Sequence, residues 1–234
     1  MIAFQFKQFS ISQEHAALKL GTDAVLLGCV TSFHNSKSIL DVGTGTGILS
    51  LIMAQKYSCP ITAIDIDENA VIDANINVKA SPWSNRITVQ QISLQDFAKS
   101  TAQQFDAIIC NPPFFTNGIL SAEKSKATAR HSVELTAETF FSSVATISAE
   151  KCCVSIILPT NEKTRYAESA TNNNFYLVQE TTIFPFENSE NPNRTILRFT
   201  KQWAPFTSSK LAIRKDKTTY SNEYKELTKD LYLD

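Results

Sequence analysis

Apolar and polar positions alternate along the chain with two periods, and this pattern predicts the architecture. Short apolar runs bounded by turn residues indicate buried strands, and apolar residues three or four positions apart indicate the helices between them. The predicted strands are 38–41, 60–65, 86–90, 105–110 and 151–158, and the predicted helices are 47–57, 68–80 and 136–149. Strands and helices that alternate in this way form βαβ units, so we expect an α/β fold with a mainly parallel sheet and helices on both faces.

The pattern changes toward the C-terminus. Two β-rich segments, 176–183 and 194–200, flank a long polar loop and predict an antiparallel hairpin. A short strand over 210–213 and a terminal helix over 221–233 complete the expected elements. We expect one domain, 1–234, made of a cap segment (1–37), a core (38–200) and a C-terminal extension (201–234).

Composition narrows the class of protein. The 234 residues are 43% apolar and 19% charged, which is ordinary for a globular domain. No apolar run reaches the roughly 20 residues of a membrane span, and the first residues do not resemble a secretory signal. We therefore expect a cytoplasmic protein without membrane association. The five cysteines form no Cys-x-x-Cys pair and no cluster with histidine, so we expect reduced thiols and no metal site.

A glycine-rich turn, Asp41-Val-Gly-Thr-Gly-Thr-Gly47, follows the first predicted core strand. Ligands of open α/β sheets bind beyond the carboxyl ends of the strands, where glycines such as Gly43 and Gly45 let the backbone approach a ligand closely. The spacing differs from the dinucleotide fingerprint, and no Gly-Lys-Ser/Thr follows, which disfavours nicotinamide, flavin and ATP. Asp41 can attract the cationic groups of S-adenosylmethionine (SAM), and Asp65, at the end of the second strand, can accept hydrogen bonds from a ribose. The alternative is a tight turn that binds no ligand.

A second motif, Asn111-Pro-Pro-Phe114, follows a later buried strand. The amide oxygen of Asn111 and the carbonyl of Pro112 can accept hydrogen bonds from a planar amine, and the prolines stiffen the loop by fixing φ. Phe114 offers a face on which a base can stack. Together the two motifs predict methyl transfer from SAM to a planar nitrogen. Phe115 is either a second base contact or simple packing.

Charge is close to balanced overall but uneven along the chain. The formal net charge of −1 is not typical of a nucleic-acid-binding domain. Two stretches are basic: 121–131, with Lys124, Lys126 and Arg130, and 201–217, with five cations against one acid. They are either solvated faces or a rim that contacts phosphates.

At these residues the chain resembles class I SAM-dependent methyltransferases of the Asn-Pro-Pro-Tyr/Phe group. Segments 4–9, 18–28, 111–115, 129–131 and 220–233 carry a narrower resemblance, to bacterial tRNA1(Val) adenine-37 N6-methyltransferases. The resemblance covers essentially the whole chain. It implies a Rossmann-like fold with a seven-stranded, mostly parallel sheet and a final antiparallel hairpin. It also implies SAM as the methyl donor, and an adenine beside the anticodon of a tRNA, flipped into the pocket, as the acceptor.

The resemblance assigns residues to each role. Cofactor binding falls to Lys19, Thr22, Asp23, Asp41, Gly43, Gly45, Asp65 and Asn111; the catalytic contacts to the adenine fall to Asn111, Pro112 and Phe114; the surrounding substrate contacts fall to Pro113, Phe115, Lys124, Lys126, Arg130, His131 and Arg194. Thr22, Asp23 and Lys19 would hold the amino-acid end of SAM. His131 is alternatively a structural residue.

Two points depart from the family pattern or remain open. The acidic position near the end of the third strand is Ser93 by spacing, with Asp96 three residues later, so the adenine ring of SAM contacts either Asp96 or the backbone. The competing functions are a glutamine-amide methyltransferase acting on a translation factor and a non-catalytic partner that binds SAM or RNA. The short segment before the core disfavours the first, and the intact motifs disfavour the second. A monomer is slightly favoured.

Overall fold

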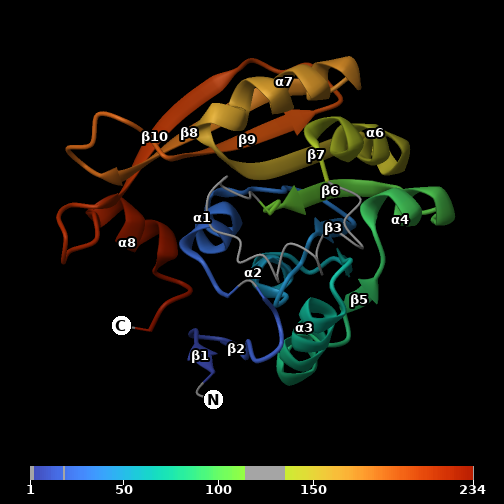
Figure 1. Cartoon of the computed structure of the whole chain (residues 1–234), viewed down its shortest axis with the longest axis horizontal. Helices are drawn as coiled ribbons and strands as arrows, with labels where there is room; N and C mark the ends of the chain where they lie inside the picture. The colour runs from blue at the N-terminus through green and yellow to red at the C-terminus, as the bar shows by residue number, and fades with distance from the viewer. Residues whose placement is uncertain (1–2, 18, 114–134, 234) are drawn as a thin grey trace, which may run out of the picture.

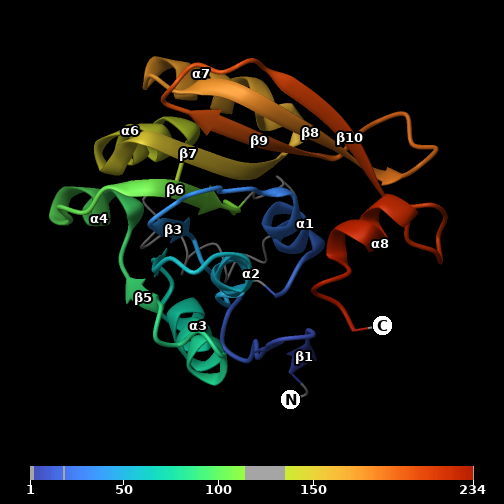
Figure 2. The same cartoon turned by 180° about the vertical axis from the view of Figure 1, so that it is seen from behind.

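The computed structural model of the chain describes residues 3–17, 19–113 and 135–233. In these ranges, one eight-stranded sheet with the order β10-β8-β9-β7-β6-β3-β4-β5 forms the centre of the molecule, and helices cover both of its faces (Figures 1 and 2). A separate pair of two-residue strands, β1 (Phe4–Gln5) and β2 (Ser10–Ile11), lies near the N-terminus. The Rossmann-like α/β fold expected from the sequence is confirmed.

Every strand and helix expected from the sequence is present, and the structure adds helices α1, α4 and α7, which the pattern did not predict. The strands of the large sheet are β3 (Ile39–Val42), β4 (Ile61–Asp65), β5 (Ile87–Gln91), β6 (Phe105–Cys110), β7 (Ser148–Pro159), β8 (Tyr176–Phe186), β9 (Arg194–Thr200) and β10 (Thr207–Arg214). The helices are α1 (Thr22–Val30), α2 (Ile48–Lys56), α3 (Glu68–Ala80), α4 (Leu94–Ser100), α6 (Ala137–Ile147), α7 (Lys163–Asn172) and α8 (Asn222–Thr228), and a 3-10 turn, η1, spans Thr160–Glu162.

The direction of the strands sets the functional edge of the sheet. Strands β3 to β7 are mutually parallel, β9 runs antiparallel between β7 and β8, and β8 and β10 run parallel to each other. The carboxyl ends of β3, β4, β6, β7, β8 and β10 therefore lie at one edge, together with the amino end of β9.

The sheet has one strand more than the seven that the resemblance implies. The additional strand is β10, which confirms and extends the short strand predicted over 210–213. It hydrogen-bonds to β8 over most of its length, so the C-terminal extension completes the sheet. The expected hairpin is confirmed as the antiparallel pair β8 and β9. The terminal helix is shorter than expected and begins after Ser221, whose hydroxyl caps it by accepting from the N–H of Tyr224.

Two apolar layers enclose the sheet. One layer joins α1, α2, α3 and α8 to alternate strand residues such as Ile39 and Ile109. The other joins α4, α6 and α7 to the intervening residues such as Leu40 and Ile108. Because neighbouring residues of a central strand enter different layers, all four residues of β3 are buried. None of the helices in the described ranges is both long enough and apolar enough to cross a bilayer.

Candidate functional site

The two sequence motifs meet at the carboxyl edge of the sheet. Val42 at the end of β3 pairs with Ile64 of β4 on one side and with Cys110 of β6 on the other. The next residues, Gly43, Asp65 and Asn111, therefore leave their strands at the same level. Since adjacent strands are about 4.8 Å apart, the glycine turn is flanked directly by the carboxylate and by the Asn-Pro-Pro segment.

The glycine turn has a backbone that only glycine adopts easily. Gly43, Gly45 and Gly47 have φ angles of 70°, 56° and 84°. A Cβ added at Gly43 or Gly45 would meet no atom within 4 Å, whereas one at Gly47 would lie 3.4 Å from the Cα of Ala74 in α3. The first two glycines thus border open space, and the third permits close packing of the turn on α3.

Asp41 is a fully buried carboxylate with spare acceptor capacity. Its Oδ2 accepts hydrogen bonds from the hydroxyls of Thr44, at 2.6 Å, and Ser50, at 2.7 Å. Its Oδ1 is buried and has no hydrogen-bond partner within the described residues. Burial raises the pKa of Asp41 to about 6, against the lowering effect of the two hydroxyls. A buried carboxylate with an unused oxygen beside an open turn fits a cationic ligand.

Asp65 links the second strand to the glycine turn. Its Oδ2 accepts from the N–H of Gly45 at 2.8 Å and its Oδ1 from the N–H of Asp67 at 2.9 Å. Burial raises the pKa of this carboxyl, although the backbone donors act in the opposite direction. Each carboxylate oxygen retains a further lone pair for a ligand hydroxyl. Asp67 caps α3 by accepting from the N–H of Asn69 at 2.9 Å.

The Asn-Pro-Pro segment is described only in part. Asn111 is half-buried, Pro112 is buried and Pro113 is exposed. Cys110, the residue before Asn111, is buried close to Asp41 and Asp65. Burial raises the pKa of its thiol, and the charges of the two carboxylates raise it further. Six of the predicted site residues lie outside the described residues: Phe114, Phe115, Lys124, Lys126, Arg130 and His131.

The segment expected to hold the amino-acid end of SAM lies at the start of α1. Thr22 is the first residue of this helix, and Gly21 before it provides no side-chain cap. Asp23 Oδ2 accepts from Nε of Arg194 at 2.7 Å, and both side chains are one-third exposed. Arg194 begins β9 opposite Pro159, the last residue of β7, which places this ion pair at the functional edge.

The positions of Lys19, Arg194 and Asp96 refine the expectations made for them. Lys19 is exposed, and its Nζ donates to the carbonyl of Gln13 at 2.5 Å. Arg194, expected to contact substrate, forms an ion pair with Asp23, a predicted cofactor residue. Asp96 is exposed in the first turn of α4 and accepts from the hydroxyl of Ser93, which caps the helix. That hydrogen bond lowers the pKa of Asp96.

Sequence reasoning missed a polar group that fastens the N-terminal segment to α3. Asp73 and Asn77 are both buried and hydrogen-bond to residues 12–16. These two polar residues lie four positions apart on the inward face of a predicted helix. That pattern indicates a hydrogen-bonded contact with another segment, since buried polar groups require partners.

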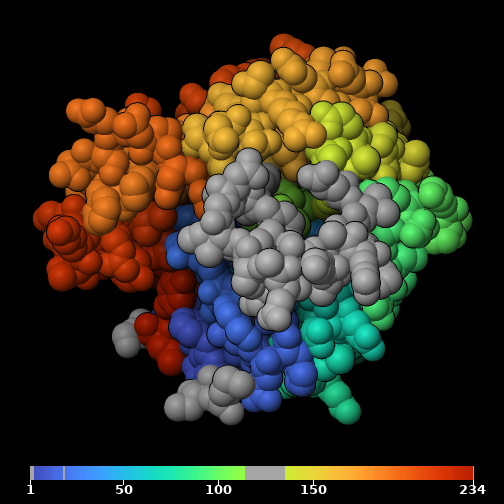
Figure 3. All heavy atoms as spheres, viewed as in Figure 1, coloured from blue at the N-terminus to red at the C-terminus, as the bar shows by residue number. Residues whose placement is uncertain are grey.

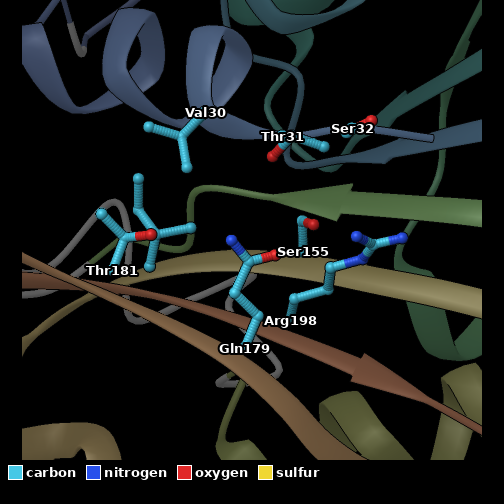
Figure 4. Close-up of a pocket in the computed structure, with 8 residues that line it drawn as sticks. Val30, Thr31, Ser32, Ser155, Gln179, Thr181 and Arg198 are labelled. Carbon is cyan, nitrogen blue, oxygen red and sulfur yellow. The ribbon is translucent and has the colours of Figure 1, made fainter. Parts of the chain in front are cut away.

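The described residues contain no cluster of metal-ligating side chains. No group of three or more His, Cys, Asp or Glu residues in these ranges can hold an ion. A cavity of about 10 Å³ lies between the end of α1 and strands β7 to β9, where Thr31 faces Ser155, Gln179 and Arg198 (Figure 4). It has room for roughly one water molecule, which the buried and unpaired hydroxyl of Thr31 would bind.

Comparisons with known proteins agree with this geometry. The family model of the methyltransferase small domain matches residues 14–144. A protein of Phocaeicola vulgatus, named tRNA1(Val) (adenine(37)-N6)-methyltransferase, is 38% identical over 98% of this chain and 97% of its own length. A protein of the same name from Pseudoalteromonas translucida is 36% identical over 100% of this chain and 99% of its own.

Solved structures share the fold at lower identity. A predicted O-methyltransferase from Agrobacterium tumefaciens superposes with a TM-score of 0.69 at 16% identity, over 89% of this chain and 96% of its own. A putative RNA methyltransferase from Pyrococcus horikoshii gives a TM-score of 0.54 at 17% identity, over 78% of this chain and 82% of its own.

Proposed function

The chain belongs to the methyltransferase small domain family, and from this premise we propose that it transfers a methyl group from SAM to the N6 amine of an adenine in tRNA. Adenine 37 of tRNA1(Val), beside the anticodon, is the proposed acceptor, because the relatives of nearly identical length carry that activity in their names. The reaction takes place in the cytoplasm, where the tRNA pool is found.

One observation carries the proposal. Asn111 leaves β6 beside the point where Gly43 leaves β3, so the group that would clamp the amine lies next to the turn that would hold the donor. The residues present also fit a cationic donor, since Asp41 offers a buried oxygen that has no partner among the described residues, and Gly43 and Gly45 border open space. A glycine turn that bound no ligand would have no use for the second carboxylate oxygen of Asp41.

Bound SAM supplies an electrophilic methyl group on a positively charged sulfur. The chain's own task is then to hold the accepting nitrogen in line. The amide oxygen of Asn111 and the carbonyl of Pro112 accept the two hydrogens of the adenine amine, which directs the nitrogen lone pair toward the methyl group. Positioning of this kind supplies most of the rate enhancement, and no general base is required, because the nitrogen loses its proton readily once it is alkylated.

Each of the acidic residues binds a different part of the cofactor. Asp41 favours the positive end of the donor, and Asp65 accepts from the ribose. Asp23, held by Arg194, and the first turn of α1 receive the amino and carboxylate groups of the methionine part, since a helix N-terminus favours an anion and a carboxylate favours a cation. We assign Arg194 to orienting Asp23 rather than to contacting RNA.

The proposal is tested by incubating the protein with tritiated SAM and total RNA from a strain that lacks the gene. The RNA is then digested to nucleosides, and label is expected in N6-methyladenosine. Asn111→Ala should abolish transfer and leave SAM binding, measured by titration calorimetry, nearly unchanged. Asn75→Ala is the matched control, because Asn75 is an exposed residue of α3 that bonds only the Val71 carbonyl of its own helix.

The outcomes separate the competing functions. Label recovered in a translation factor and absent from RNA would assign the chain to glutamine-amide methylation. SAM binding with no transfer to any acceptor would support the non-catalytic partner. Full activity of Asn111→Ala would remove the proposed clamp.

A further inference from the structure

The N-terminal strap, which we define as residues 12–17, is fastened to α3 by two buried side chains. Asn77 Oδ1 accepts from the N–H of Ser12 at 2.7 Å, and its Nδ2 donates to the carbonyl of the same residue at 2.8 Å. The strap and α3 lie side by side beneath the functional edge, and Figure 3 shows the N-terminal segment (blue) meeting α3 (teal) on this face. The side-chain amide of Asn77 thus binds both the backbone N–H and the backbone carbonyl of Ser12.

Asp73, one turn earlier on α3, binds the other part of the strap. Its Oδ2 accepts from the N–H groups of His15, at 3.0 Å, and Ala16, at 2.8 Å. Its Oδ1 lies 2.7 Å from the ring Nδ1 of His15. Asp73 is completely buried, so these contacts with the strap occupy both of its oxygens away from bulk water.

Asn77 also reaches the glycine turn. The same Nδ2 that binds the strap donates to the carbonyl of Thr46 at 2.8 Å. The turn packs on α3 at this point, where Gly47 lies against Ala74. One side chain therefore joins the strap to the backbone that is proposed to hold SAM.

The strap is joined in turn to the start of α1. Gln13 accepts from the N–H of Leu20 through its side chain, at 2.7 Å, and from Lys19 Nζ through its carbonyl. Leu20 packs on the apolar core, and α1 begins two residues later with Thr22 and Asp23. Hydrogen bonds joined by short stretches of backbone thus connect the glycine turn, through Asn77 and the strap, to Leu20 just before α1.

We propose that Asn77 and Asp73 are positioning residues for SAM: they clamp the strap to α3 and so fix the start of α1 relative to the glycine turn. This inference rests on the proposed function, because it concerns the same donor site. Neither residue touches the reacting atoms. Their effect is on the fraction of molecules in which both halves of the donor site are in place, and the apparent affinity falls in proportion to that fraction.

The test uses Asn77→Asp in the full-length protein. The substitution keeps the shape and the acceptor for Ser12 but removes both donors and sets a carboxylate oxygen against the carbonyls of Ser12 and Thr46. The dissociation constant and KM for SAM should rise about 5- to 30-fold. The kcat at saturating SAM and the KM for tRNA should stay within twofold of wild type. Without ligand, amide hydrogen exchange should accelerate in peptides covering residues 12–17.

Two controls separate positioning from general destabilisation. Asn75→Asp makes the same change in charge on an exposed face of the same helix and should leave SAM affinity unchanged. Ser169→Ala removes a buried hydrogen bond to the carbonyl of Ala137 in the opposite layer, and it should lower the melting temperature without altering the KM for SAM.

A second variant breaks the same series of contacts at the end that lies near α1. Gln13→Ala removes the side-chain bond to Leu20 and leaves no buried charge, so it tests the inference even if Asn77→Asp does not fold. Unchanged SAM affinity in Gln13→Ala, or in a folded Asn77→Asp, would overturn the positioning role. Absence of SAM binding in the wild-type protein would instead overturn the proposed function, so the two failures are distinguishable.

Discussion

Replacing Gly45 with alanine separates the structural role of the glycine turn from its proposed role in ligand binding. The residue has a φ of 56°, and a Cβ at this position would meet no atom within 4 Å. The folded state of Gly45→Ala therefore suffers backbone strain without a clash. That strain costs about 1–2 kcal/mol for a residue in the left-handed region. For a chain of this length, the melting temperature should fall by roughly 2–8 °C.

The effect on SAM binding should be larger than the effect on stability. The new methyl group occupies the open space in which the donor is proposed to lie, and any shift of the backbone also disturbs the hydrogen bond from Gly45 N–H to Asp65. We expect the dissociation constant for SAM to rise at least tenfold, which corresponds to about 1.4 kcal/mol of binding free energy. Titration calorimetry measures the affinity, and differential scanning calorimetry measures the stability.

Gly47→Ala is the matched comparison. Gly47 has the same sign of φ, at 84°, but its Cβ would point at Ala74, 3.4 Å from the Cα, rather than into open space. Its loss of stability should exceed that of Gly45→Ala, and its loss of SAM affinity should be smaller. Wild-type affinity in Gly45→Ala, or the reverse order of the two variants, would refute the claim that the turn faces the ligand.

Three further predictions follow from charged groups. SAM affinity should fall as the pH drops through about 6, by up to about tenfold per pH unit. The pKa of Asp41 is raised to about 6, so below this pH its carboxyl is neutral and does not attract a cation. Isothermal titration from pH 5 to 8 measures this dependence, and a flat profile would contradict it. For Asp73, burial acts to raise the pKa, but the strap donors outweigh it and the net shift is downward. Its contribution to stability should therefore be present above the unfolded-state pKa of about 4 and be lost on further acidification, so that denaturant unfolding curves of Asp73→Asn and wild type converge at low pH. Arg194→Gln should weaken SAM binding more than tRNA binding because it releases Asp23, whereas the opposite split would restore the substrate-contacting role.

Much of the fold was predictable because local and long-range preferences agree. Segment 105–110 is apolar except for Asp106, and 68–80 carries apolar residues at helical spacing. The structure places β6 and α3 over these same ranges. The helices that the pattern did not predict carry a weaker signal. α1 buries five consecutive residues, so its burial shows no helical period, and α4 and α7 bury only two and three residues. Only packing against the sheet distinguishes them from loops.

The candidate site was predictable where it depends on strand ends and not where it depends on distant contacts. Gly43, Asp65 and Asn111 each follow a strand whose parallel direction could be inferred, so their convergence follows from topology. The ion pair of Asp23 with Arg194 joins residues 171 positions apart, one in α1 and the other at the start of the antiparallel strand β9. No local pattern encodes that contact, and the role predicted for Arg194 came from the family resemblance.

The energetics of Asp41 favour a cationic ligand over a neutral or anionic one. Raising its pKa from 3.8 to about 6 opposes folding by about 3 kcal/mol at neutral pH, an order-of-magnitude figure obtained at 1.36 kcal/mol per pH unit. Stabilisation of the fold does not explain such a charge, because an amide of the same shape could accept the hydroxyls of Thr44 and Ser50 with no charge to bury. A phosphate near Asp41 would add repulsion, and a neutral nucleoside would leave the unpartnered oxygen uncompensated. A sulfonium or ammonium group recovers the opposing free energy on binding. We therefore expect the carboxylate that destabilises the unliganded protein to select a donor such as SAM from other adenosine-containing molecules.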